Sequence, residues 1–207
     1  MNSVIANIVT DAFGWLEDFS ASGWFLLIIF VIALLDSVIP VVPSETMVII
    51  GGVAAGQGDQ VLLLVIVAGA TGAFVGDNTA YALGRGLSGW INRKAEERPT
   101  WRTRLDWAAE QIQVRGGPLL VTARFIPGGR TALTVSSGIT HQPRRWFVGW
   151  VVVAVTIWAT YAAVLGWWFG DNFDHTTALL LAFGAALAIN VLIEVIRHYR
   201  NKRNAAA

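Results

Sequence analysis

The chain has 207 residues, of which 55% are hydrophobic and 14% are charged, and its net charge is +1. Soluble domains carry about 25% charged residues, so this composition argues against a soluble protein and indicates one whose main solvent is lipid. The small net charge gives no basic field for nucleic acid, and the absence of cysteine excludes disulfides, thiolate catalysis and thiolate metal sites. The length fits a single membrane domain, residues 1–207.

The first predicted element is an amphipathic helix at the membrane surface, within residues 1–19. Its apolar side chains share one helical face: Ile5, Ile8, Val9, Ala12, Phe13 and Leu16. The segment lacks a basic start and carries three acidic residues, so it is not expected to be a signal peptide.

A broken apolar stretch comes next. Residues 24–35 and 47–55 are apolar, and the segment between them contains Asp36, Pro40, Pro43 and Glu45. Each limb is too short to cross a hydrocarbon core of about 30 Å, because ten helical residues rise about 15 Å. Proline cannot continue the helical hydrogen bonds, so we predict a re-entrant hairpin with its tip at the break. One kinked span starting at Trp24 is the alternative.

The first full span is predicted at residues 61–83, which are apolar apart from Asp77. A basic connecting loop, residues 86–115, follows this span. Within the loop a second surface helix is expected, because four apolar side chains share a face: Trp101, Leu105, Ala108 and Ile112.

The second broken stretch has two short apolar limbs, residues 117–126 and 131–139. Pro127, Gly128 and Gly129 stand between the limbs and predict a second re-entrant hairpin. Two further full spans are predicted after it, at residues 147–169 and 176–196.

The order of surface helix, hairpin and span therefore occurs twice, at about residues 1–85 and 99–169, and residues 176–196 add one extra span. Basic residues concentrate in 85–115, at 144–145 and after residue 196, which places these segments and the C-terminus in the cytoplasm. Asp59 and the 170–175 turn are then expected outside. The two units would insert in opposite senses, so we predict an all-α, multi-pass inverted repeat in the cell membrane, an architecture typical of transporters.

Five charged residues lie in these apolar surroundings: Asp36, Glu45, Asp77, Arg124 and Arg130. Charges at membrane depth are costly and by default functional. Ser44 suits a helix N-cap, and Glu45 would lie in the following first turn, where the helix dipole favours an anion. Plain capping is the alternative role for Glu45. Asp77 comes six residues before the predicted helix end, so we expect it to be only partly submerged, and a structural role for it stays open.

Arg124 and Arg130 flank the break in the second hairpin, one on each limb. Chain reversal would aim both guanidinium groups at one place, and such groups bind phosphate bidentately. The free N–H groups at the start of the second limb would add to an anion site. Structural ion pairs between the arginines and Asp36, Glu45 or Asp77 are the alternative.

Three motifs, in this order, resemble the DedA family, also called the SNARE-associated or VTT-domain family. They are Pro40-x-x-Pro43-Ser44-Glu45, Gly76-Asp77-x-x-x-Tyr81-x-x-Gly84-Arg85 and Arg124-Phe125-x-Pro127-x-x-Arg130-Thr131. The resemblance covers about residues 24–168. It implies two opposed re-entrant hairpins and, for bacterial members, a link to undecaprenyl phosphate recycling. It also implies functional roles for Asp36, which stands where many members have Glu, and for Glu45, Arg124 and Arg130.

We therefore expect a flippase or scramblase that moves undecaprenyl phosphate, another polyprenyl phosphate or a related anionic lipid between leaflets and supports envelope homeostasis. The arginines would hold the phosphate, and Asp36, Glu45 and Asp77 would gate transport or couple it to protons. A proton-coupled transporter of a small ion or cationic solute, with the carboxylates as ligands, is the alternative.

An enzyme is not expected, because the histidines lie outside the apolar spans and no zinc-protease or serine-hydrolase motif is present; the histidines are His141, His175 and His198. No catalytic residue, cofactor or metal site is expected. Membrane lipids are the expected partners, nucleic acid is not, and the sequence allows a homo-oligomer.

Overall fold

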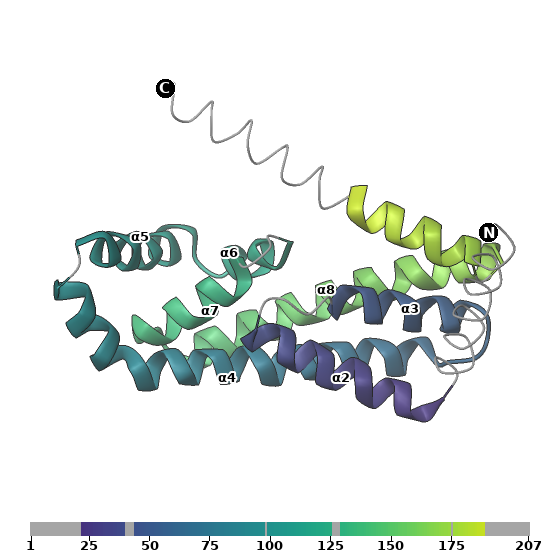
Figure 1. The fold of residues 1–207 in the computed structure, drawn as a ribbon, viewed down its shortest axis with the longest axis horizontal. Coiled ribbons are helices and arrows are strands. Elements are labelled where there is room, and N and C mark those ends of the chain that lie inside the picture. Colours follow the sequence, from purple (N-terminus) through teal and green to yellow (C-terminus); the bar gives the residue numbers. More distant parts are fainter. Residues whose placement is uncertain (1–21, 40–43, 98, 126–128, 175, 189–207) are drawn as a thin grey trace, which may run out of the picture.

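The computed structural model describes residues 22–39, 44–97, 99–125, 129–174 and 176–188. The predicted all-α class is confirmed, because every regular element in these ranges is helical (Figure 1). The elements are α2 (Gly23–Val38), α3 (Ser44–Gly56), α4 (Leu62–Glu97), α5 (Pro99–Arg115), α6 (Pro118–Thr122), the 3₁₀ turn η1 (Ala123–Phe125), α7 (Gly129–Ile139), α8 (Arg144–Asn172) and a helix at Thr176–Ala188.

The first hairpin consists of α2 and α3. Figure 1 shows α2 running to the middle of the molecule and α3 returning toward the end at which α2 begins. Both limbs are longer than predicted, so that Asp36 lies in the last turn of α2 and Glu45 in the first turn of α3. The predicted tip residues Pro40 and Pro43 lie outside the described residues. Insertion of this hairpin into a membrane remains a prediction.

Helix α4 differs most from its prediction, because the segment 86–115 is not a loop. The span predicted to end at Leu83 continues as one 36-residue helix to Glu97. Nothing between these positions breaks a helix, and the first proline, Pro99, starts α5 at a position where its missing N–H is harmless. The predicted helix around residues 101–112 is confirmed as part of α5.

The second hairpin consists of α6 and η1 as its leading limb and α7 as its returning limb. In Figure 1 the leading limb runs from the α5 end of the molecule to the middle, and α7 runs back. Gly129 is the first residue of α7, whereas Pro127 and Gly128 lie outside the described residues.

Among the described residues, α4 and α8 are the two helices long and apolar enough to cross a membrane. The helix at Thr176–Ala188 covers the first part of the predicted extra span, and the rest of that span lies outside the described residues. The predicted helix within residues 1–19 lies outside them too.

Glycines allow the second limb of each hairpin to pack closely on the long helix of the other half. Between α3 and α8, a Cβ atom at Gly52 would lie 2.3 Å from the carbonyl oxygen of Ala163. Between α7 and α4, a Cβ atom at Gly138 would lie 2.1 Å from the carbonyl oxygen of Tyr81. Only glycine fits at such distances, so the backbones themselves form these contacts. As a result, the limb ends that flank the two chain breaks, at Val38, Ser44, Phe125 and Gly129, lie toward the middle of the bundle (Figure 1).

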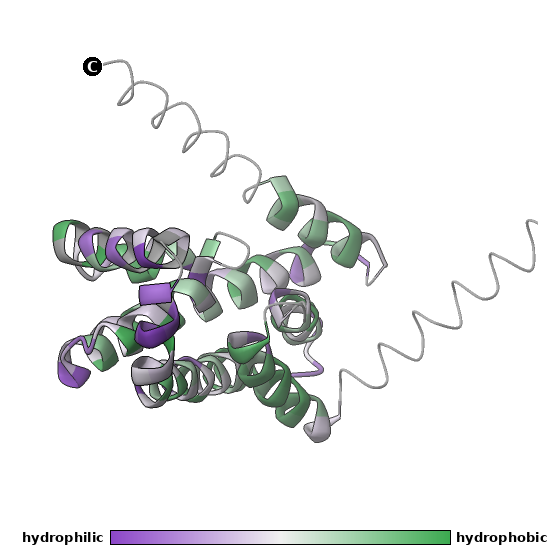
Figure 2. Ribbon diagram, turned by 60° about the vertical axis from the view of Figure 1, so that its left-hand side comes forward, coloured by the Kyte–Doolittle hydropathy of each residue, from purple (hydrophilic) through white to green (hydrophobic). Residues whose placement is uncertain are grey.

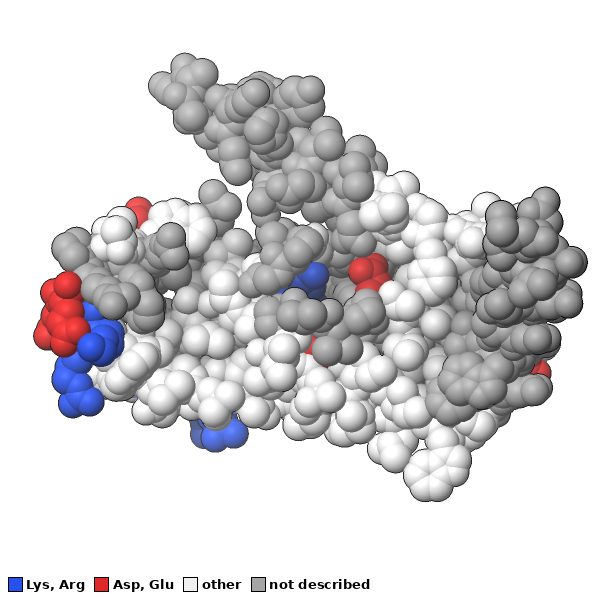
Figure 3. Space-filling model, viewed as in Figure 1, with Lys and Arg blue, Asp and Glu red and all other residues white. Residues whose placement is uncertain are grey.

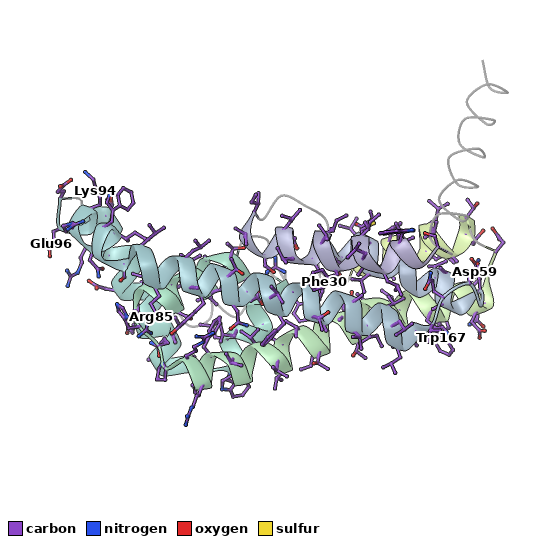
Figure 4. The ribbon with its side chains drawn as sticks, turned by 90° about the horizontal axis from the view of Figure 1, so that it is seen from below. Phe30, Asp59, Arg85, Lys94, Glu96 and Trp167 are labelled. Atoms are coloured by element: carbon purple, nitrogen blue, oxygen red, sulfur yellow. The ribbon has the colours of Figure 1, made fainter. Side chains whose placement is uncertain are left out.

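The outer faces of the long helices are apolar. Figure 2 shows hydrophobic residues along the helices, and several large ones are exposed: Leu27, Leu63, Leu64, Val67, Val152 and Ile157. In Figure 4, Lys94 and Glu96 lie at one end of the molecule, and Asp59 and Trp167 lie at the other. Apolar sides with polar ends are typical of a protein that spans a membrane.

Candidate functional site

The described ends of the hairpin limbs meet α4 at a group of charged side chains. Asp36 comes from α2, Asp77 from α4, Arg124 from η1 and Arg130 from the first turn of α7. Figure 3 shows acidic and basic atoms in the middle of a surface that is otherwise largely uncharged there. The structure therefore brings together four of the five charged residues that the sequence placed in apolar surroundings.

Asp77 lies at the centre of this network. Its side chain is 1% exposed, its Oδ2 accepts a hydrogen bond from Arg124 Nη1 at 2.5 Å, and its Oδ1 lies 3.7 Å from Arg130 Nε. Asp77 lies in the interior of α4, which continues far beyond Leu83, and is buried within the protein; its depth in a membrane remains a prediction. One buried carboxylate thus serves two arginines.

Asp36 extends the network to the first hairpin. Arg130 Nη2 lies 3.1 Å from Asp36 Oδ2, and the Ser44 hydroxyl donates a hydrogen bond to the same oxygen. Ser44 is the first residue of α3, so this bond joins the two limbs of the hairpin, a contact that its predicted N-cap role did not include. Both side chains of the Asp36–Arg130 pair keep some exposure, at 17% and 12%.

One edge of the buried Arg124 guanidinium is left without hydrogen bonds within the described residues. Its side chain is 2% exposed and its Nη1 is bonded to Asp77, but its Nε and Nη2 have no hydrogen-bond partner among the described residues. These two nitrogens form one edge of the planar guanidinium, the edge that can hold two oxygens at once. The guanidinium carbon lies 5.3 Å from the ring centre of Trp158 on α8, and this contact stabilises the cation from one face.

Glu45 lies in the first turn of α3, as predicted, directly after Ser44, whose hydroxyl bonds Asp36. The Tyr161 hydroxyl is buried and has no hydrogen-bond partner in the described part of the chain. Its ring lies 5.9 Å from that of Phe125, the residue that follows Arg124. Tyr161 of α8 therefore borders the network through Phe125, and Glu45 follows Ser44 at the α3 side of the network.

Unsatisfied polar atoms gather at this one place. The buried side-chain polar atoms that lack a hydrogen-bond partner within the described ranges belong to Asp77, Arg124 and Tyr161. Such atoms are few in native proteins, since each costs about 1–3 kcal/mol. Their concentration beside the hairpin tips fits a site that takes up a polar ligand. Those ranges contain no group of three His, Asp or Glu side chains that could hold a metal ion.

Sequence reasoning missed two aromatic side chains beside the site, Trp158 and Tyr161, and the hydrogen bonds that hydroxyl groups make there. Trp158 and Tyr161 lie in a charge-free span, where they looked like ordinary apolar residues. Their spacing of three residues, at mid-span rather than at the membrane boundary, was the available signal. Thr131 of α7 also donates a hydrogen bond to the carbonyl of Ser37 on α2 at 3.3 Å, which joins the two hairpins.

The fold and the site define a helical membrane protein built around a buried network of acidic residues and arginines. The chain belongs to the VTT-domain family, whose model matches residues 39–168. This match confirms the family that the three motifs predicted.

Curated relatives extend the similarity over nearly the whole chain. Protein DedA of Escherichia coli (strain K12) is 26% identical over 191 residues, which is 88% of this chain and 87% of that protein. Undecaprenyl phosphate transporter A of Bacillus subtilis (strain 168) is 24% identical over 207 residues, 100% of this chain and 98% of that protein. The protein of the same name from Staphylococcus aureus is 23% identical over 180 residues, 81% of this chain and 85% of that protein.

These relatives are named as transporters or by family, not as enzymes, which supports the prediction that the chain is not an enzyme. No solved structure gives a significant match.

Replacing Asp77 by Asn is expected to destabilise the protein by about 3–5 kcal/mol, because it leaves two arginines facing a neutral amide in a buried site. Asp36→Asn should cost less, since its ion pair with Arg130 is partly exposed. Glu97→Gln, which breaks the exposed pair with Lys94, is the control and should leave the melting temperature unchanged. Thermal unfolding of the purified variants in detergent measures all three. Equal melting temperatures for Asp77→Asn and wild type would contradict a structural dependence on the network.

Proposed function

We propose that this protein transports an anionic lipid with a phosphate head group, undecaprenyl phosphate first of all, between the leaflets of the cell membrane. The observation that carries the proposal is the open Nε–Nη2 edge of Arg124, buried among apolar helices. A phosphate presents pairs of oxygens that match such an edge in a bidentate contact. The names of the relatives from Bacillus subtilis and Staphylococcus aureus support the choice of lipid.

Asp77 and Asp36 prepare the arginines for this ligand. Asp77 holds Arg124 through Nη1 and leaves the bidentate edge free, while Arg130 lies between Asp36 and Asp77. An arriving phosphate would bind Arg124 first and then compete with a carboxylate for Arg130. Only the head group needs this polar path, because the lipid tail stays in the hydrocarbon.

Charge balance supports proton coupling at the carboxylates. In the network, Asp36 and Asp77 balance Arg124 and Arg130. A phosphate monoester brings about −1.5 to −2 charges, which a buried site cannot hold without compensation. Protonation of two of the carboxylates of Asp36, Asp77 and the neighbouring Glu45 would offset this charge, and their deprotonation would then expel the phosphate.

The two halves are proposed to form an inverted repeat, residues 1–85 and 99–169, with re-entrant hairpins that enter from opposite leaflets. The reciprocal packing supports this arrangement, because α3 lies on α8 and α7 lies on α4. The hairpins also open toward opposite ends of the molecule in Figure 1. Two such hairpins would give the network access to either leaflet in turn.

The first test concerns orientation. Glu96 and Asp59 are exposed and lie at opposite ends of the molecule (Figure 4). Because the chain has no cysteine, single Glu96→Cys and Asp59→Cys variants can be labelled with an impermeant thiol reagent on oriented vesicles. Asp59→Cys should react from outside, and Glu96→Cys only after the vesicles are opened. Labelling of both from the same side would rule out this orientation.

The second test replaces the two arginines of the central network, Arg124 and Arg130. Arg124→Lys and Arg130→Lys keep the charge but lose the planar edge, so transport of labelled polyprenyl phosphate in liposomes should fall roughly 10- to 100-fold. Arg102→Lys, in an exposed pair with Asp106, is the matched control and should transport normally. Labelled phospholipid and a labelled small cation are assayed in parallel. Native lipid transport by both fork variants at native melting temperature would refute the phosphate contact, and cation flux without lipid flux would favour the proton-coupled cation transporter.

The third test concerns Glu45. If its carboxylate carries the coupling proton, Glu45→Gln should abolish most transport and remove the pH dependence of what remains, without a change in melting temperature. Transport rates of the variant are measured in liposomes across a pH series. A native rate with a native pH profile would show that Glu45 serves only as a helix-terminal anion.

A further inference from the structure

A second polar site lies around Arg85, outside the central network of Asp36, Asp77, Arg124 and Arg130. A cavity of about 610 Å³ opens there between α4 and the turn that joins α7 to α8. Its polar lining comes from Asn78, Tyr81, Arg85, His141 and Arg144, and none of the described residues that line it is acidic. Arg85 lies eight residues beyond Asp77, about 12 Å along α4, and the lining shares no residue with the network. Its chemistry favours an anion.

An apolar groove continues from this cavity. A second cavity of about 780 Å³ shares Asn78, Ala82, Gly86 and Arg144 with the first and runs between α4 and α8. Its other lining residues are mainly apolar: Phe74, Val75, Leu83, Leu87 and Val148. Val75 and Leu83 are 40% and 48% exposed, so this apolar surface lies uncovered. The two cavities together form a groove with a basic end and an apolar length, which we call the α4–α8 groove.

The backbone of the α7–α8 turn is held so that an imidazole lines the basic end. His141 has a φ of +55°, its N–H bonds to the carbonyl of Gly138, and the N–H of Gln142 bonds to that of Ser137. These are the two bonds of a Schellman motif, whose left-handed position glycine normally occupies. A histidine there is disfavoured by its Cβ, and such local strain is typical of functional positions.

Tyr81 joins this turn to Arg85. Its hydroxyl donates a hydrogen bond to the carbonyl of Gln142 at 2.6 Å and accepts one from Arg85 Nη1 at 3.0 Å. The ring of Tyr81 is buried and stacks on Phe147, with ring centres 4.4 Å apart. The guanidinium of Arg85 and the imidazole of His141 are therefore placed on a common, rigid support beside Arg144.

We propose that the α4–α8 groove is a docking site for a polyprenyl phosphate lipid. Arg85, His141 and Arg144 bind its phosphate, and the apolar length holds the first isoprenoid units. The placement of the groove at a membrane surface rests on the proposed function. The site would load lipid from the leaflet next to Arg85, and the head group would then pass to Arg124.

The test uses protection of a cysteine in the groove. Gly86 lines both cavities, and a Cβ atom there meets nothing within 4 Å, so Gly86→Cys fits without strain. Gly89→Cys is the matched control on the same helix: it also has open space and lines neither cavity. Farnesyl phosphate should slow alkylation of Gly86→Cys by N-ethylmaleimide at least threefold and leave Gly89→Cys unaffected. Farnesol or inorganic phosphate at the same concentration should protect far less.

Equal protection by farnesol would show that the groove is only an apolar surface. Equal protection by inorganic phosphate would show an adventitious ion only. No protection by farnesyl phosphate would overturn the proposal.

His141→Gly in the Gly86→Cys background separates binding from folding. Glycine adopts the left-handed conformation freely, so the melting temperature should be kept or raised, while the half-protecting concentration should rise at least threefold. Arg144→Gln should raise it at least tenfold. Unchanged protection in both variants would contradict the assignment.

Arg124→Lys in the same background separates this site from the central one. The variant should lose transport but keep protection of Gly86→Cys. Retained transport together with protection would refute the role of Arg124 in binding the phosphate and leave the groove proposal intact. Lost transport without protection in the parent protein would refute the groove alone.

Discussion

The structure depends on one buried carboxylate, that of Asp77, and on the two guanidinium groups that face it. Asp77 is 1% exposed and lies in the interior of α4, where neither lipid nor bulk water can solvate a charge. Arg124 and Arg130 must therefore reach it from the second hairpin, and Arg130 in turn holds Asp36 of the first. The described limb ends of both hairpins meet at mid-molecule, where these charges find their partners. The network thus stabilises the positions to which the prolines and glycines allow the chain to reverse.

The same constraint explains what the sequence revealed and what it did not. Because a charge in an apolar segment needs a partner, Asp36, Arg124 and Arg130 could be assigned to one site from their positions alone. The choice of partners could not be assigned, since it depends on how α2, α4 and α7 cross. The length of α4 was missed because residues 84–97 are too polar for a span yet contain nothing that ends a helix. Trp158 was missed because an aromatic residue in an apolar span is ordinary, and only the fold places its ring against Arg124.

The α4–α8 groove and the central network suit two different steps in the transport of a lipid with a phosphate head group: capture at the membrane surface and passage across the membrane. The groove offers exposed basic side chains, with no acidic residue among the described residues that line it, which suits capture of an anion from a membrane surface. The network offers arginines that already pair with carboxylates, so a phosphate that binds the unbonded edge of Arg124 must compete with a carboxylate for Arg130. Exchange of one anion for another leaves little net electrostatic gain, and a site of this kind releases its ligand as readily as it takes it up. That balance suits passage better than storage.

The glycine contacts between the second limbs and the long helices have a mechanical consequence. At Gly52 and Gly138 the facing helices touch through their backbones, because neither position carries a side chain. Interlocked side chains oppose sliding, whereas a smooth backbone contact permits one helix to shift along another by shear with its packing preserved. A shift of α7 along α4 would carry Arg130 past Asp36 and Asp77 while the apolar core stays closed. The glycines therefore leave room for such a shift, and the ion pairs of Arg130 with Asp36 and Asp77 would oppose it until they are broken.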